Sequence, residues 1–454
     1  MTPDAEHYRS ARLARDPRFD GTFFVAVKTT GIYCRPVCPA PAPKEANVVY
    51  FQSAAEAAAN GFRPCLRCRP ESAPGSWAWK GVDTTFERAL KLIDQGVLTS
   101  GNLAQLAERL GISDRYLRRV FAERCGLSPK QYAQYRQLLF SKQLLHETRL
   151  QVCEVAIASG FNSVRRFNDS FSRHFSLTPG QVRRSGTPSE GPVQLKLVYR
   201  PPFNWTSMRG FLARRQIPGM EWVTEQSLGR TFSWDNDRVR GYFTARHCPD
   251  ENAFRVDLSL SDTSALIAVV NNIRRILDLD ADSGEVDAHL SRTAVIRQHL
   301  QPGLRLPGIW NLYEAGIRAI LGQQVSVRAA TQLVTQLVST LGVQQDDRFW
   351  FPLPGNVAEH SLDFLKIPMI RKQTLRDFIR SVANQSRSVI LSEDMDSWRE
   401  IKGIGQWTVD YARLRGLSDP DIWLGSDLGV RKVAAERLQL TDDVIRAPLP
   451  GAVI

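Results

Sequence analysis

Apolar residues in the N-terminal half of the chain follow a helical spacing that occurs twice. Residues 103–110 (LAQLAERL) carry Leu or Ala at i, i+3, i+4 and i+7, and residues 152–159 (VCEVAIAS) repeat the spacing 49 residues later. Each copy continues into a glycine-containing turn, a second amphipathic stretch and a closing Leu-Ser-Pro or Leu-Thr-Pro. The pair therefore predicts two helix-turn-helix units.

The second half of the chain begins with strand-like patterns and becomes helical. Residues 194–280 contain β-rich stretches such as AFRVDLSL, and from Trp310 onward the spacing is helical. Segments rich in Ser, Gly and Pro at 72–82 and 185–193 are typical of a loop and a linker. With 454 residues, the chain is too long for one core.

We therefore expect a multidomain fold that is mainly α with α+β parts. The expected parts are a four-cysteine module, a tandem helix-turn-helix domain, a small α+β domain and an all-helical domain. Their expected bounds are 1–76, 82–185, 194–283 and 284–454.

Composition restricts the class of protein. The chain is 43% hydrophobic and 23% charged, which is typical of a soluble globular protein. No apolar run approaches the roughly 20 residues that span a bilayer, and the N-terminus has no apolar signal core. We therefore expect a cytoplasmic protein with no membrane partner, in a compartment where clustered cysteines more often bind metal than form disulfides.

The formal net charge of +12 is concentrated in the first half of the chain. Residues 1–190 hold 27 Lys and Arg against 17 Asp and Glu, whereas the remainder holds 32 against 30. A basic half favours a polyanionic partner, and nucleic acid is the first candidate.

Four of the seven cysteines form two clusters. Three residues separate Cys34 from Cys38, and after a further 26 residues come Cys65 and Cys68, separated by two. This is close to the spacing of a tetrahedral four-cysteine Zn2+ site. One interpretation is a structural zinc that holds together a module with little core of its own. The other is that one zinc-bound thiolate reacts, because zinc keeps thiolates deprotonated and four of them give the site a formal charge of about −2.

The residues around the cysteines favour the second interpretation. The stretches DGTFFVAVKTTGIYCRPVCPA and GFRPCLRCRPE closely resemble the zinc domain of the Ada adaptive-response proteins, over nearly the whole of residues 5–71. The resemblance implies that all four cysteines bind zinc and that Cys34 accepts a methyl group from methylphosphotriesters in DNA, displacing a phosphodiester. Methylation lowers the negative charge of the site, so we expect it to tighten DNA binding. Prolines at 39, 41 and 43 stand where the family often has basic residues.

Residues 84–184 resemble the AraC-type DNA-binding domain, and the second unit, ASGFNSVRRFNDSFSRHFSLTP, fits the signature of that family. The resemblance places recognition helices near Ser113 and Asn162, facing major grooves. The alternative is a helical bundle with solvated arginines. The residues expected to face DNA are Asp114, Arg115, Arg118, Arg119, Ser163, Arg165 and Arg166.

Three stretches of the second half resemble the AlkA-type 3-methyladenine DNA glycosylases. They are KLVYRPPFNWTSMRGFLARRQ at 196–216, GLRLPGIWNLYEAGIRAILGQQVSVR at 303–328 and IKGIGQWTVDYARLRGLSDPDIWLGSDLGVRK at 401–432. Within the last, GIGQWTVDY is typical of a helix-hairpin-helix. Its turn, with Gly403 and Gly405, is expected to present backbone N–H groups to a DNA phosphate.

The same resemblance implies a hydrolytic site. Asp427 is expected to stabilise the positive charge that develops on the sugar as the N-glycosidic bond breaks. A flipped base is expected to enter an aromatic pocket formed by Trp407 and Tyr411, and the alternative for either residue is a plain core position. Trp407 stands where related lyases have a Schiff-base lysine, and no cysteine quartet follows. We therefore expect neither a lyase step nor an iron–sulfur cluster.

Two departures from the AlkA pattern bear on activity. Gln324 occupies the position of the wedge that fills the gap left by the flipped base, which is Leu in some members. The chain ends in LTDDVIRAPLPGAVI, whereas the family continues through a further helical segment. We expect the final helices to be missing and the pocket to be less well closed.

The order of the three resemblances is that of an Ada–AlkA fusion. We expect a protein that accepts methyl groups on Cys34, activates transcription together with RNA polymerase, and excises alkylated bases such as 3-methyladenine from nucleoid DNA as a monofunctional glycosylase. One alternative is a methylation-activated transcription factor whose glycosylase part is inactive. Another is a plain zinc-stabilised DNA-binding protein. The Pro-Cys-His-Arg motif of O6-alkylguanine repair does not occur in the sequence.

Overall fold

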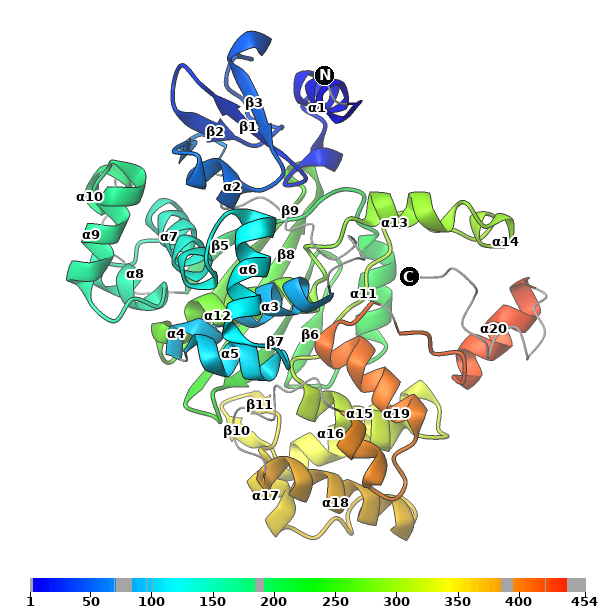
Figure 1. The fold of residues 1–454 in the computed structure, drawn as a ribbon. Helices are drawn as coiled ribbons and strands as arrows, with labels where there is room; N and C mark the ends of the chain where they lie inside the picture. The colour runs from blue at the N-terminus through cyan, green and yellow to red at the C-terminus, as the bar shows by residue number, and fades with distance from the viewer. Residues whose placement is uncertain are drawn as a thin grey trace. The chain divides into compact units, whose positions relative to one another are not determined.

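The structure is a computed structural model of the chain, and it describes residues 3–68, 70, 84–94, 96–100, 102–183, 192–384, 395–420 and 422–438 (Figure 1). The chain divides into two compact units. One comprises residues 1–203, 245–274 and 279–285, and the other comprises 204–244, 275–278 and 286–454. The loop expected at 72–82, most of the linker at 185–193 and the C-terminal stretch 440–454 lie outside the described residues. Within the described ranges, no helix is long and apolar enough to cross a membrane.

The first unit begins with a small sheet covered by helices on both faces. The strands are β1 (Phe24–Val27), β2 (Ile32–Cys34), β3 (Val48–Phe51) and β4 (Arg63–Pro64), in the order β3-β1-β2-β4. Because successive side chains of a strand point to opposite faces, β1 contributes to two apolar clusters. Phe24 and Ala26 lie in one cluster with α2 (Ala54–Ala59), and Val25 lies in the other with α1 (Pro3–Ala14). Short 3-10 helices η1 (Pro17–Phe19) and η2 (Glu45–Asn47) complete the module.

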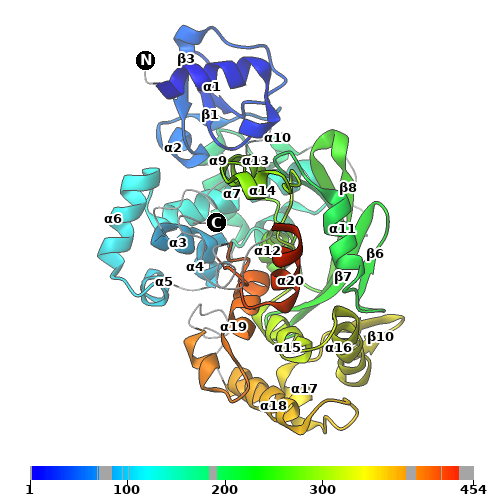
Figure 2. The same cartoon turned by 90° about the vertical axis from the view of Figure 1, so that its right-hand side faces the viewer.

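The duplicated helix-turn-helix plan predicted from the spacing is confirmed (Figure 2). Ser113 and Ser163 stand at equivalent places as the N-caps of the two second helices, where their side chains accept hydrogen bonds from the backbone N–H groups of Tyr116 and Arg166. The helices are α3 (Thr84–Asp94), α4 (Val97–Ser100), α5 (Leu103–Arg109), α6 (Asp114–Cys125), α7 (Pro129–Glu147), α8 (Val152–Ala158), α9 (Val164–Phe175) and α10 (Pro179–Val182). The first helix-turn-helix consists of α5 and α6, and the second consists of α8 and α9.

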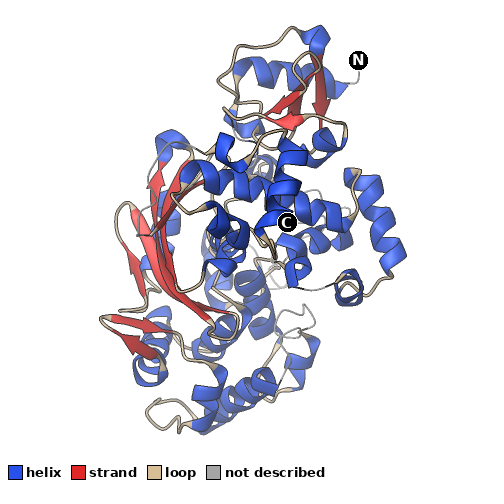
Figure 3. Ribbon diagram, turned by 90° about the vertical axis from the view of Figure 1, so that its left-hand side faces the viewer, coloured by secondary structure: helices blue, strands red, loops and turns tan. Residues whose placement is uncertain are grey.

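The expected α+β part contains a five-stranded sheet with the order β5-β9-β8-β7-β6 (Figure 3). Its strands are β5 (Val193–Val198), β6 (Glu221–Val223), β7 (Ser227–Trp234), β8 (Val239–Cys248) and β9 (Ala253–Leu260). β5 pairs antiparallel with β9, and β6 pairs antiparallel with β7. Along β8 buried and partly exposed residues alternate, as expected when one face of a sheet packs on a core. The accompanying helices are α11 (Trp205–Ala213), η5 (Pro249–Glu251), η6 (Thr263–Ala265), α12 (Leu266–Ile276), α13 (Ser283–Leu290) and α14 (Ala294–Arg297).

Within its described residues, the part that was expected to be all helical consists of helices and one short hairpin. The hairpin pairs β10 (Val343–Gln345) with β11 (Arg348–Trp350), and strands of three residues leave no periodic signal in a sequence. One apolar core, which includes Ile317, Leu337, Phe378 and Val409, holds this part together. The helices are α15 (Leu312–Gly322), α16 (Val327–Leu341), α17 (Pro354–Glu359), α18 (Met369–Asn384), η7 (Asp396–Glu400), α19 (Gln406–Ala412), η8 (Arg413–Leu417) and α20 (Leu428–Leu438).

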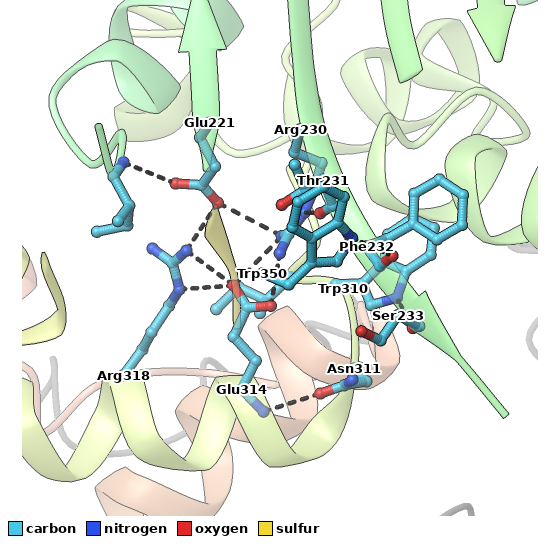
Figure 4. A network of polar contacts seen from close by, with 12 residues as sticks. Glu221, Arg230, Thr231, Phe232, Ser233, Trp310, Asn311, Glu314, Arg318 and Trp350 are labelled. Atoms are coloured by element: carbon cyan, nitrogen blue, oxygen red, sulfur yellow. Dashed lines mark hydrogen bonds and ion pairs between the residues drawn. The ribbon is translucent and has the colours of Figure 1, made fainter. Parts of the chain in front are cut away.

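A buried network of ion pairs joins α15 to strands β6 and β7 (Figure 4). Glu314, with a side chain only 1% exposed, accepts hydrogen bonds from Arg230 at 2.7 Å and from Arg318 Nε at 2.9 Å. Glu221 pairs with the same two arginines, at 2.7 Å to Arg318 and 3.4 Å to Arg230. Because the two carboxylates and the two guanidinium groups balance in charge, the network can lie against an apolar core.

Candidate metal centre and candidate active site

The four clustered cysteines lie together at one end of the small sheet. Cys34 is the last residue of β2 and Cys65 follows β4 directly, and these two strands are parallel neighbours. The Sγ atoms of Cys34, Cys38, Cys65 and Cys68 lie within 4.8 Å of one another. A Zn–S distance of about 2.3 Å places tetrahedral sulfur ligands about 3.8 Å apart. The donor set therefore fits one zinc ion, as the sequence predicted.

Positive groups and hydrogen-bond donors surround this cluster. The backbone N–H of Arg35 donates to Sγ of Cys68 at 3.3 Å, and the Arg35 side chain donates to the Cys68 carbonyl at 3.1 Å while pairing with Asp20. Lys142, fully buried on α7, donates from Nζ to the carbonyl of Cys65 at 3.0 Å. The cluster therefore has one backbone donor on a sulfur and two cationic side chains held close to it.

The four thiols differ in exposure. Cys65 and Cys68 are buried, whereas Cys34 and Cys38 are half-buried. Hydrogen bonding with the Cys34 thiol lowers the pKa of Cys38 to about 7. A thiolate that reacts with an external group must be reachable, so Cys34 and Cys38 are the better-placed candidates.

The five arginines expected to face DNA lie on the surfaces of the two second helices. Arg118 and Arg119 on α6 have exposed side chains, and each has a weak ion pair one helical turn away, with Asp114 at 3.5 Å and with Glu123 at 3.8 Å. The other three are exposed and form no ion pair with any described residue; they are Arg115, Arg165 and Arg166. All five guanidinium groups are therefore accessible to solvent.

In the segment expected to form the helix-hairpin-helix, η7 precedes the turn that contains Gly403 and Gly405, and α19 follows it. Gly403 has a φ of 94°, and a Cβ there would lie 2.2 Å from Oγ1 of Thr374, so glycine is required at this turn. Gly405 is the N-cap of α19, and a Cβ there would meet nothing within 4 Å. The carbonyl of Gly403 accepts a hydrogen bond of 2.9 Å from Gln323, which ties the hairpin to the end of α15.

Gln324, the expected wedge residue, lies in the loop between α15 and α16. Its side chain is exposed, and its φ of 54° is a left-handed conformation that is uncommon outside glycine. The side chain of the preceding Gln323 holds the loop, because it donates to Thr408 at 3.1 Å as well as to Gly403. The loop is thus fixed beside the hairpin.

Asp427, Trp407 and Tyr411 lie close together in the structure. Nε1 of Trp407 donates a hydrogen bond of 2.9 Å to Oδ2 of Asp427, and the rings of Trp407 and Tyr411 stack with centroids 5.4 Å apart. Oδ1 of Asp427 accepts from the backbone N–H groups of Gly429 at 2.8 Å and Val430 at 3.0 Å. Both carboxylate oxygens are therefore fixed in direction.

These three residues line a cavity of about 1230 Å3 in the second unit, and Gln324, Gly403 and Gly405 line it as well. Trp407 and Tyr411 are both half-buried and both line the cavity, and Tyr411 also packs against the apolar core of this part. The volume exceeds what a single nucleobase needs and lies above the range of about 300–1,000 Å3 that is typical of ligand sites.

Several functional groups of this cavity were not found from the sequence. Arg215, Arg415 and Arg318 line it, together with Glu221. Arg215 follows α11 in an Arg-Arg pair, and no spacing rule says which member of such a pair turns inward. Arg415 stands in the short π-helix η8, a rare element without a sequence signature.

Three family models match the chain. The metal binding domain of Ada matches residues 7–71, a helix-turn-helix domain matches residues 106–185, and the AlkA N-terminal domain matches residues 194–311. These matches agree with the resemblances seen in the sequence and, with the cysteine cluster, support zinc as the metal.

Known proteins are similar over the whole chain and over its parts. The "Probable bifunctional transcriptional activator/DNA repair enzyme AlkA" of Mycobacterium tuberculosis is 35% identical, over 97% of this chain and 91% of that protein. "DNA-3-methyladenine glycosylase 2" of Escherichia coli is 29% identical, over 52% of this chain and 85% of that protein. The "Bifunctional transcriptional activator/DNA repair enzyme Ada" of Escherichia coli is 40% identical, over 29% of this chain and 35% of that protein.

Proposed function

We propose, from the premise that the chain belongs to the family of bifunctional Ada/AlkA transcriptional activators and DNA repair enzymes, that it senses and repairs alkylated DNA at two separate sites. One site is the cysteine cluster of the first unit, and the other is the cavity that contains Asp427 in the second. The observation that carries the proposal is the oriented carboxylate of Asp427 beside two stacked aromatic rings.

At the first site, Cys34 is proposed to accept a methyl group from a methylphosphotriester. Cys34, Cys38, Cys65 and Cys68 would hold the zinc ion, which would keep their sulfurs deprotonated. The Cys34 thiolate attacks the methyl carbon, an S–C bond forms, the C–O bond breaks, and the phosphodiester leaves with the electron pair. The half-buried position of Cys34 supports this role over the buried Cys65 and Cys68.

The helix-turn-helix domain is proposed to carry the transcriptional activity. Exposed arginines on α6 and α9, the two N-capped second helices, are proposed to contact DNA, and RNA polymerase is proposed as the protein partner. Loss of one negative charge on methylation of Cys34 weakens repulsion from DNA phosphates, so the methylated protein is expected to bind promoter DNA more tightly. The protein is accordingly proposed to act on nucleoid DNA in the cytoplasm.

At the second site, Asp427 is proposed to support hydrolysis of the bond between a damaged base and its sugar. The base flips into the cavity and contacts Trp407 and Tyr411, while the loop of Gln324 occupies the space left in the duplex and the hairpin of Gly403 and Gly405 binds a phosphate. The carboxylate stabilises the oxocarbenium character of the sugar, and water adds to C1′. Alkylated purines such as 3-methyladenine are cationic and leave readily.

Base release from methylated duplex DNA tests this part. The Asp427→Asn variant keeps the size of the side chain but removes the charge, so single-turnover release is expected to fall by about 100-fold or more. Asp410→Asn, on the neighbouring helix α19, is the matched control and is expected to retain activity. Equal release by wild type and Asp427→Asn would favour a transcription factor without glycosylase activity.

A further inference from the structure

A fully buried arginine of the α+β part binds a residue of the four-cysteine module. Arg200 lies just after strand β5, and its side chain is 0% exposed. Its Nε donates a hydrogen bond to the backbone carbonyl of Asp20, which lies 180 residues earlier in the chain, and its Nη1 pairs with Asp282 at 3.1 Å. All three residues belong to the first unit. The α+β part therefore holds the module at Asp20.

Asp20 in turn holds Arg35, the residue that follows Cys34 in the sequence. The Asp20 carboxylate accepts a hydrogen bond of 2.7 Å from Nε of Arg35 and pairs with Nη2 of the same side chain. A contact at two points fixes the plane of the guanidinium group. Arg35 is held a second time by Cys68, because its backbone N–H donates to Sγ at 3.3 Å and its Nη1 donates to the carbonyl at 3.1 Å. The backbone next to Cys34 is thus fixed through Arg35.

The charges along this set of contacts alternate in sign. Asp282, Arg200, Asp20 and Arg35 are in turn negative, positive, negative and positive, and none of the four side chains is more than 12% exposed. Burial lowers the pKa of Arg200, and the charges of Asp282 and Asp20 oppose that effect. Apolar residues of similar size would fill such space at less cost than buried charges do. The buried arginine therefore indicates a role beyond filling the core.

Arg274, in the same α+β part, has the same kinds of partner as Arg200. It pairs with a carboxylate, that of Asp280, at 3.1 Å, and it donates to a backbone carbonyl, that of Val198, at 3.3 Å. Its side chain is only 13% exposed. Both of these partners lie in or beside the α+β part itself, whereas one partner of Arg200 lies in the four-cysteine module. Arg274 is therefore a matched control for Arg200.

We propose that Arg200 is a positioning residue for methyl transfer: through Asp20 and Arg35 it holds the backbone that carries Cys34, so the α+β part is a component of the methyl-acceptor site. The inference rests on the proposed function of Cys34. In that transfer the sulfur must lie in line with the C–O bond that breaks as the S–C bond forms. Loss of Arg200 loosens this alignment without removing any of the four cysteines.

The rate of methyl uptake by the full-length, zinc-loaded chain measures the alignment. Uptake from methylphosphotriester DNA is followed by mass spectrometry under single-turnover conditions, at a saturating concentration of DNA. Arg200→Gln is expected to lower the rate constant by about 10-fold or more, because a small misplacement of a reacting atom has a large effect on the rate. Arg200→Lys, which keeps the charge but not the planar fork, should be intermediate. Arg274→Gln should stay within about 2-fold of wild type.

Hydrogen exchange of the Arg35 amide reports on position without any methyl transfer. This amide donates to Sγ of Cys68, so in Arg200→Gln we expect it to exchange about 10-fold faster than in wild type, in protein that has not been exposed to DNA. The amides of the paired strands β1 and β3 should exchange as in wild type, and the zinc content should be unchanged. Faster exchange throughout the module would show a role in folding alone and would overturn the inference.

Asp20→Asn tests whether Arg200 acts through Asp20. This variant weakens the hold on Arg35 directly, so the double variant with Arg200→Gln should be no slower in methyl uptake than Asp20→Asn alone. Losses that add in the double variant, equal uptake by wild type and Arg200→Gln, or the same loss in Arg274→Gln would each overturn the inference and leave the proposed function intact. A wild-type chain that takes up no methyl group would overturn both.

Discussion

The indole Nε1 of Trp407 donates a 2.9 Å hydrogen bond to Oδ2 of Asp427, and this contact aims the carboxylate into the cavity. The other oxygen, Oδ1, is held by the two backbone N–H groups at the start of α20. A carboxylate with both oxygens held has little freedom to turn away, and a fixed negative charge stabilises a developing cation better than a mobile one. Trp407 is thus proposed to position Asp427 as well as to contact the base.

Trp407→Phe separates these two roles. Phenylalanine keeps an aromatic ring for stacking and removes the donor to Asp427, so we expect the rate of base release at saturating enzyme to fall by about 10-fold. The affinity for damaged DNA should change much less. Tyr411→Phe, which leaves the Trp407–Asp427 bond in place, is the control. A fall in affinity with an unchanged rate would show that Trp407 acts through base contact alone.

Removal of zinc should separate the two proposed activities. All four cysteines belong to the first unit, and every residue that lines the cavity belongs to the second. A chelator is therefore expected to abolish methyl uptake and to unfold the small module, which depends on its metal. Base release should stay within about 2-fold of the untreated protein.

Zinc content measured beside both activities checks this expectation. Cys68→Ser should reproduce the effect of the chelator, whereas Cys153→Ser, at an exposed cysteine outside the cluster, should have none. If base release were lost on chelation and restored by added zinc, the two sites would not be independent.

The ion-pair network around Glu314 should be a large contributor to the stability of the second unit. Although burial disfavours its charged form, the adjacent Arg230 and Arg318 hold the pKa of Glu314 below the ordinary value of 4.5. Glu314→Gln leaves Glu221 as the one carboxylate for two buried guanidinium groups, so the free energy of unfolding is expected to fall by about 3–5 kcal/mol. Urea denaturation followed by tryptophan fluorescence measures the change.

The same network predicts a pH dependence with a definite sign. Because the folded-state pKa of Glu314 is depressed, its contribution to stability is complete above pH 4.5 and is lost as the pH falls through the lower folded-state value. The difference in the free energy of unfolding between wild type and Glu314→Gln should therefore stay constant from pH 7 down to about pH 4.5 and shrink as the pH falls further. Glu359→Gln, at an exposed position on α17, should behave like wild type at every pH. A difference that grew as the pH fell would contradict the assignment.

Much of this organisation was predictable because its signals are local in sequence. The two helix-turn-helix units were visible in the spacing of residues 103–110 and 152–159, and the metal cluster in the spacing of Cys34, Cys38, Cys65 and Cys68. The family resemblance implied roles for Asp427 and Trp407. These residues are 20 positions apart in the sequence, and the fold brings them within hydrogen-bond distance. The roles of these residues remain proposals.

Other features depend on contacts that no local pattern records. Glu314 lies on a nearly all-apolar helix and pairs with Arg230, 84 residues earlier in the chain. Arg215 lines the cavity, whereas its neighbour Arg214 at the end of α11 is exposed. Such side chains can be assigned only once the tertiary structure shows which charges are paired and which are not.

The central claim, that the Cys34 thiolate takes methyl from alkylated DNA, is tested most directly by mass spectrometry. The zinc-loaded protein is incubated with duplex DNA that contains methylphosphotriesters, digested, and its cysteine peptides are compared with those of the Cys34→Ser variant. We expect one added methyl group on the peptide that contains Cys34 in the wild-type protein and none in the variant. An unmodified Cys34, or a methyl group found on Cys38 instead, would contradict the account.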